Sequence, residues 1–82
     1  MSLITGKYLG DNVVQESPTG AINGSNTSFA LSVSPNYSGS VFIYKNGLIQ
    51  RLTTDFTVSG VTITMIVAPA SGSSLYAVYI KE

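Results

Sequence analysis

The feature that most constrains this chain is an alternation of apolar and polar residues with a period of two, which runs from Thr27 to Ile80 in short stretches between turn signals. Successive side chains of a β-strand point to opposite faces, so this period indicates half-buried strands. No segment keeps the helical period for three turns. We therefore predict an all-β fold, a small antiparallel β-sandwich or partly open barrel of five to seven short strands with an N-terminal arm. The predicted strands cover residues 27–33, 40–45, 48–52, 54–58, 61–67 and 74–80.

Tight-turn signals separate the predicted strands. Asn46-Gly47 accepts positive φ at both central positions of a type I′ turn, so it predicts a hairpin that folds residues 48–52 back onto residues 40–45. Ser59-Gly60 is a second tight-turn signal, and a turn is also expected between Pro69 and Ser73. The predicted fold is therefore antiparallel.

The alternation also assigns side chains to faces. Phe29 and Phe56 are predicted core residues. The strand at 40–45 is apolar on both faces, which indicates that both faces are covered. The sets predicted to share a face are Phe29, Leu31 and Val33; Val41 and Ile43, opposite Phe42 and Tyr44; Val61, Ile63, Met65 and Val67; and Leu75, Ala77 and Tyr79, opposite Tyr76, Val78 and Ile80.

Residues 1–19 differ from the rest of the chain, because their apolar side chains lie among Gly, Asp and Asn. We interpret this segment as an N-terminal arm that ties the subunit to a neighbour, and residues 20–82 as the β-sandwich domain. The alternative is that the segment supplies an extra strand to the same sheet, for which residues 13–16 are the candidate. The predicted arm anchors are Leu3, Ile4, Tyr8 and Leu9.

The chain lacks the side chains on which most catalytic and metal sites depend. It contains no Cys and no His, which removes disulfides, thiolate sites, and the commonest general base and metal ligand. No two of its carboxylates are spaced i, i+2 or i, i+4. We therefore expect no enzymatic activity, no cofactor and no metal, and we interpret Asp55 as a turn residue that hydrogen-bonds local backbone. The carboxylates are Asp11, Glu16, Asp55 and Glu82.

Charge is scarce in this sequence. Charged residues make up 10% of the chain, against roughly 25% in an average domain, and the net charge is zero. The basic residues are scattered and the apolar runs are short, so neither nucleic acid nor a membrane is an expected partner. A small chain this poor in charge indicates a surface that copies of itself or other partners cover. The alternative is a neutral monomer that its many Ser, Thr, Asn and Gly residues keep soluble.

Three tyrosines are candidates for contact with a partner or a ligand. Aromatic side chains are enriched in protein interfaces, and aromatic stripes on a sheet can also stack on sugars. The candidate interface or ligand-contact residues are Tyr37, Tyr44 and Tyr76.

An ordered series of motifs extends over most of the chain. It consists of GAINGSNTSFAL from Gly20, GSVFIYKNGLIQR from Gly39, TDFTVSGVTIT from Thr54 and APASG from Ala68, followed by a last strand that contains tyrosines. Residues 20–80 therefore resemble a β-sandwich module of tailed-bacteriophage virion proteins, found in tail-fibre, neck and decoration-type accessory proteins. Phe56 stands where Tyr is common in this module and Met65 where Phe is common, and both keep the apolar bulk.

The resemblance implies a virion structural protein, made in the bacterial host cytoplasm, without catalysis. It also implies a homo-oligomer, often a trimer, that contacts capsid or tail subunits. Because the module makes up nearly the whole chain, a capsid decoration protein or a small head–tail or tail accessory subunit fits better than a long fibre. The alternative is a carbohydrate- or receptor-binding module of a tail fibre, in which the candidate tyrosines stack on host-surface glycans.

Overall fold

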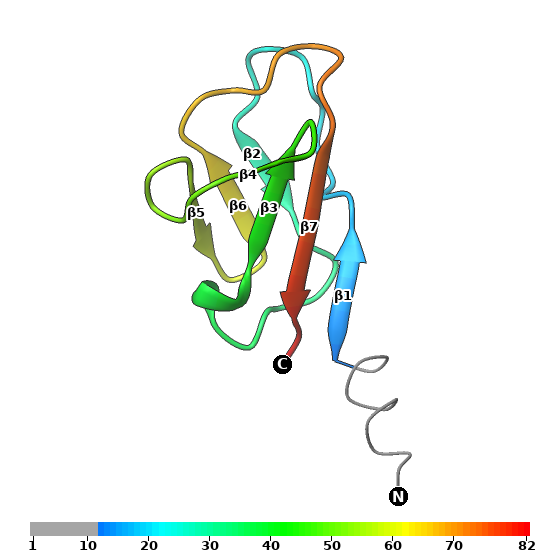
Figure 1. Cartoon of the computed structure of the whole chain (residues 1–82), viewed down its shortest axis with the longest axis vertical. Coiled ribbons are helices and arrows are strands. Elements are labelled where there is room, and N and C mark those ends of the chain that lie inside the picture. The colour runs from blue at the N-terminus through cyan, green and yellow to red at the C-terminus, as the bar shows by residue number, and fades with distance from the viewer. Residues whose placement is uncertain (1–11) are drawn as a thin grey trace, which may run out of the picture.

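The computed structural model describes residues 12–82, which form seven strands and one 3-10 turn (Figure 1). The strands make two antiparallel sheets of four and three strands that lie in two layers, so the predicted all-β, sandwich-like fold is confirmed. Within these residues, no helix is long and apolar enough to cross a membrane. The strands are β1 (Val13–Glu16), β2 (Ser28–Ala30), β3 (Phe42–Lys45), β4 (Leu48–Ile49), β5 (Phe56–Ser59), β6 (Thr62–Met65) and β7 (Leu75–Ile80), and the 3-10 turn η1 spans Ser38–Ser40.

The chain passes repeatedly from one layer to the other. The order of strands is β1-β7-β3-β4 in the four-stranded sheet and β2-β6-β5 in the three-stranded sheet. The last strand, β7, lies between β1 and β3 and pairs antiparallel with both (Figure 1). The strand β1 therefore agrees with the alternative interpretation, in which residues 13–16 add a strand to the same sheet. The predicted arm anchors Leu3, Ile4, Tyr8 and Leu9 lie outside the described residues.

Two tight hairpins set the register. Asn46 and Gly47 have φ values of 54° and 82°, and Lys45 pairs with Leu48, so the predicted type I′ hairpin is confirmed. The second hairpin joins β5 to β6 through the pair Ser59 and Thr62. Its central residues are therefore 60–61, one position later than the sequence signal suggested, and the positive φ falls on Gly60 at 59°.

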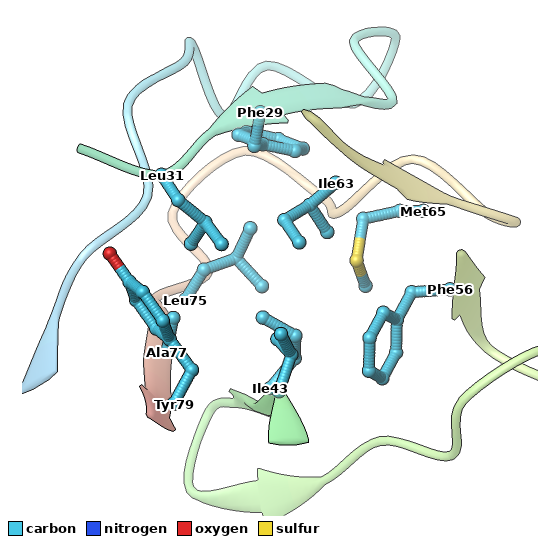
Figure 2. Close-up of a cluster of buried hydrophobic side chains, with 10 residues drawn as sticks. Phe29, Leu31, Ile43, Phe56, Ile63, Met65, Leu75, Ala77 and Tyr79 are labelled. Carbon is cyan, nitrogen blue, oxygen red and sulfur yellow. The ribbon is translucent and has the colours of Figure 1, made fainter. Parts of the chain in front are cut away.

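The core fills the space between the two sheets (Figure 2). Phe29 and Phe56, which were predicted core residues, are 2% and 0% exposed. The strand β7 keeps the predicted alternation, because its three inward residues are at most 4% exposed while its outward residues remain partly exposed. The buried apolar side chains are Phe29, Leu31, Val41, Ile43, Phe56, Ile63, Met65, Leu75, Ala77 and Tyr79.

Several predicted strands are shorter in the structure than in the sequence pattern. The strand β2 ends at Ala30, and the chain bends before Pro35, so Val33 is 40% exposed and does not share the buried face of Leu31. Similarly, β6 spans only 62–65, which leaves Val67 at 69% exposure. The backbone bends at residues 32–33 and 66–67, so the apolar alternation continues in the sequence after regular pairing has stopped.

The strand predicted at 48–52 is also reduced, to the two residues of β4. The Gln50 amide still donates to the Ile43 carbonyl at 2.7 Å, but the chain then leaves the sheet. Thr53 adopts a left-handed φ of 68° in the loop that follows. The alternating pattern of residues 50–52 therefore extends past the end of regular pairing.

Candidate functional site

The outward side of the four-stranded sheet carries large apolar side chains. Phe42 is 50% exposed, Ile49 is 56% exposed, and Tyr76 and Ile80 are each 42% exposed. Two further members are half-buried. The expectation that both faces of β3 are covered is therefore not met within the described residues. We call this surface the outer apolar face, and it consists of Phe42, Tyr44, Ile49, Tyr76, Val78 and Ile80.

The strand register brings these side chains together. Tyr44 lies directly opposite Tyr76 in the pairing of β3 with β7, and Phe42 lies opposite Val78. In the pairing of β3 with β4, Tyr44 lies opposite Ile49. Residues opposite one another in an antiparallel pair project from the same face, with Cβ atoms about 4.5–5.5 Å apart. The outer apolar face is therefore continuous across three strands.

No outward position of the described four-stranded sheet carries a charge. The outward residues of β1 are Val13 and Gln15, which lie opposite Ile80 and Val78. A fully exposed large side chain has roughly 200 Å² of surface. Scaled by their exposed fractions, the four most exposed members of the outer apolar face together leave on the order of 400 Å² accessible to solvent. A contiguous apolar patch of this size lies within the range of the largest patch on a typical monomeric protein, and such patches are often functional.

Gln15 holds the ring of Tyr76 in place. The Tyr76 hydroxyl donates a hydrogen bond to Gln15 Oε1 at 3.2 Å. Gln15 lies opposite Val78 on β7, so the bond runs diagonally across the ladder. It gives the hydroxyl a partner within the protein and leaves the apolar faces of the ring available for contact.

The structure brings together two of the three candidate tyrosines. Tyr44 and Tyr76 are cross-strand neighbours near the β3–β4 hairpin. Tyr37 is 62% exposed and precedes η1, where its carbonyl accepts hydrogen bonds from the Ser40 amide at 3.0 Å and hydroxyl at 2.9 Å. The same hydroxyl lies 3.5 Å from the Ile80 carbonyl, at the far end of β7. Tyr37 is therefore exposed but separate from the tyrosine pair.

The outward side of the three-stranded sheet has a different chemistry. Its exposed side chains are short, and five of the six carry a hydroxyl group. Thr57 lies opposite Thr64 in this sheet, as Tyr44 lies opposite Tyr76 in the other. The described domain thus has one apolar and one hydroxyl-rich side. We call the second surface the hydroxyl face, and it consists of Ser28, Ala30, Thr57, Ser59, Thr62 and Thr64.

A polar contact that the alternation did not predict ties β1 to the core. The Tyr79 hydroxyl donates to Glu16 Oε2 at 2.6 Å, and the Ser32 amide donates to the same oxygen at 3.0 Å. In Figure 2 this hydroxyl lies at the margin of the buried cluster. Partial burial disfavours the charged carboxylate, but these hydrogen bonds outweigh it and lower the pKa of Glu16. Burial, together with the bond to Glu16, raises the pKa of Tyr79.

These shifts predict how stability depends on pH. The pKa of Glu16 in the folded state lies below the unfolded value of 4.5. The ionised carboxylate therefore contributes its full stabilisation above pH 4.5, and this stabilisation is lost as the pH falls below 4.5 and through the folded-state pKa. The raised pKa of Tyr79 predicts a second loss of stability as the pH rises above 10.0.

Urea unfolding between pH 3 and pH 7 should show that the free energy of unfolding falls less with acid in Glu16→Gln than in the wild type. Glu82→Gln is the matched control for an exposed carboxylate, and an unchanged acid dependence in Glu16→Gln would contradict the assignment.

A shallow hollow opens beside the β3–β4 hairpin. Its volume is about 190 Å³, and its lining includes Lys45, Asp55 and the buried Met65. The Asp55 carboxylate accepts a hydrogen bond from the Arg51 amide at 2.8 Å, which confirms its predicted role in a turn. In residues 12–82, no group of three or more acidic side chains is placed to hold a metal ion. The carboxylate in this hollow is thus already engaged in holding the loop.

Comparison with known proteins finds no relative of this chain. No protein-family model matches the chain, and no curated protein and no solved structure matches it.

Proposed function

We propose that this protein is a non-enzymatic structural accessory subunit of a tailed-phage virion. It is made in the bacterial host cytoplasm, associates with itself, and assembles in many copies on capsid or tail subunits. Two observations support this proposal. The motifs of residues 20–80 resemble a virion module, and the domain exposes an apolar surface suited to assembly.

The outer apolar face is the observation that carries the proposal. The core is already filled by ten side chains between the sheets, so this second apolar surface is not needed to bury the inner faces. Exposed apolar area on a chain with few charges favours association. Self-association through this face gives an oligomer, and an oligomer that engages several sites at once binds far more tightly than each contact alone. A repetitive particle surface supplies such sites.

A second candidate function is recognition of a host-surface carbohydrate. The observation that favours it is the pair Tyr44 and Tyr76, which places two aromatic rings side by side on an open sheet. Aromatic faces of this kind can stack on sugar rings. We rank it below assembly because the neighbours of the pair are apolar, as Ile49 and Phe42 are, and a sugar site also needs polar groups that fix the hydroxyls.

Quantitative mass spectrometry of purified particles tests the proposed function. The particles should be prepared from cells that produce both the virion and this chain. We expect the protein at a reproducible copy number per particle, in the tens or more, because a symmetric surface offers many equivalent sites. Trace amounts that vary between preparations, or recovery only in the soluble fraction, would refute the proposal.

A glycan array separates the two candidates. If the protein is a structural subunit, the wild type should bind no glycan above background. Specific binding that is lost in Tyr76→Ala and kept in Tyr37→Ala would instead support carbohydrate recognition. Tyr37 is the matched control because it is exposed but lies away from the tyrosine pair.

A further inference from the structure

We infer that the outer apolar face is covered by the same face of a second copy, so that two four-stranded sheets pack face to face about a twofold axis. This inference rests on the proposed function, because it names the partner that occupies the assembly face. It differs from the trimer that the sequence resemblance implies.

The charge pattern favours a second copy as the occupant. The outward positions of β1, β3, β4 and β7 contain no Lys, Arg, Asp or Glu. A partner with charged groups at this place would lose their hydration and find no opposite charge, which is costly. An apolar, uncharged sheet face avoids that loss, and this chain itself carries such a face. In a twofold interface the same patch serves both partners.

Four of the side chains of this face also permit dry packing. The Tyr76 hydroxyl already donates to Gln15 within the subunit at 3.2 Å, so covering it leaves no donor without a partner. Phe42, Val78 and Ile80 have no polar side-chain atom. These four side chains can therefore be buried without the cost of stranded polar groups.

The geometry and the area suit a weak dimer. Two sheets that pack face to face lie about 10 Å apart with their strands within about 30° of each other, as in the interior of a sandwich. The most exposed side chains of each subunit offer on the order of 400 Å², and the half-buried members add to this area. Summed over both partners, the buried area is about 1,000 Å², which is the lower bound of specific interfaces. We therefore expect a dissociation constant in roughly the micromolar range.

The hydroxyl face serves as the comparison for the outer apolar face. It has the same number of outward residues and is also uncharged, but hydroxyl groups retain their hydrogen bonds with water. Only the apolar side of the domain is thus expected to self-associate. Thr64, which lies at the centre of the three-stranded sheet between β2 and β5, is the matched control position.

Sedimentation equilibrium of the full chain tests the inference. The wild type should show a monomer–dimer equilibrium, Phe42→Glu should raise the dissociation constant at least 100-fold, and Thr64→Glu should change it less than threefold. Circular dichroism melting verifies that each variant is folded, and Ile80→Lys replaces Phe42→Glu if that variant is unfolded. A wild type that stays monomeric at millimolar concentration, a trimeric mass, or equal dissociation constants for both variants would overturn the inference.

Cysteine cross-linking gives an independent measurement, because the natural chain contains no Cys. Val78 lies between Gln15 of β1 and Phe42 of β3, in the middle of the face. Under mild oxidation Val78→Cys should form a covalent dimer with at least tenfold higher yield than Thr64→Cys. Equal yields would contradict face-to-face packing.

The two proposals fail in different ways. If the isolated protein is monomeric but Phe42→Glu is still lost from particles, the face contacts another virion protein and only the dimer is refuted. If the dimer forms but the particles contain none of the protein, the dimer stands and the virion role is refuted.

Discussion

Phe56→Ala is expected to lower the free energy of unfolding by about 3–5 kcal/mol. Phe56 is 0% exposed, lies opposite Met65 in the pairing of β5 with β6, and faces the β3 residue Ile43 across the core (Figure 2). Removing the ring forfeits its burial and leaves a cavity that the neighbouring strands cannot fully close. A domain of 82 residues has a total stability on the order of 4–12 kcal/mol, so the variant should be largely unfolded or close to it at 37 °C. Urea titration followed by circular dichroism measures the loss.

Phe42→Ala is the matched control, because it makes the same change in a ring that is 50% exposed on the outer apolar face. We expect it to lower the free energy of unfolding by less than about 1 kcal/mol, since a surface position leaves no cavity. Comparison of the two variants thus distinguishes a phenylalanine that stabilises the fold from one that we assign to assembly. Similar losses in the two variants would show that the outer face is part of the stabilising core.

Deletion of residues 1–16 is expected to destabilise the domain by about 3–5 kcal/mol, by the sum of lost burial and hydrogen bonds. The deletion removes β1, and with it the packing of Val14 against the core. It also removes the Glu16 carboxylate, which leaves the buried Tyr79 hydroxyl and the Ser32 amide without this partner. Thermal and urea unfolding of the shortened chain would measure the effect.

A shorter deletion, of residues 2–11, is the control that separates folding from assembly. It retains β1 and removes the predicted anchors Leu3, Ile4, Tyr8 and Leu9. We expect it to keep most of the stability of the wild type and to reduce incorporation into particles. If the two deletions are equally destabilising, the contribution that we assign to β1 is wrong; if the shorter deletion is incorporated normally, the arm has no role in assembly.

The sequence predicted those parts of the fold that depend on local chemistry. Asn46-Gly47 determines a type I′ hairpin by its backbone preference alone, and the alternation in β7 separates Ala77 and Tyr79 from the outward Tyr76. The class of fold and the identity of most core residues follow from such patterns. Strand ends did not, because Val33 and Val67 continue the apolar alternation after the backbone has left the sheet.

The candidate site was less accessible to sequence reasoning. Tyr44 and Tyr76 are predicted contact residues from the sequence alone, but their pairing depends on β7 returning beside β3, which no local pattern encodes. The bond between Glu16 and Tyr79 joins residues 63 positions apart, so no spacing rule could find it. The alternation showed that β3 is apolar on both faces, but only the sheet order shows that one of these faces lies on the outside of the described sandwich.

The most direct test of the account compares two double variants in a particle-incorporation assay. Tyr44→Asp with Tyr76→Asp places two charges on a cross-strand pair of the outer apolar face, and Thr57→Asp with Thr64→Asp does the same on the hydroxyl face. Copy number per particle is measured by quantitative mass spectrometry, with each variant first shown to be folded. We expect at least a tenfold loss for the tyrosine pair and little change for the threonine pair. Wild-type copy number for the tyrosine pair would contradict assembly through the outer apolar face.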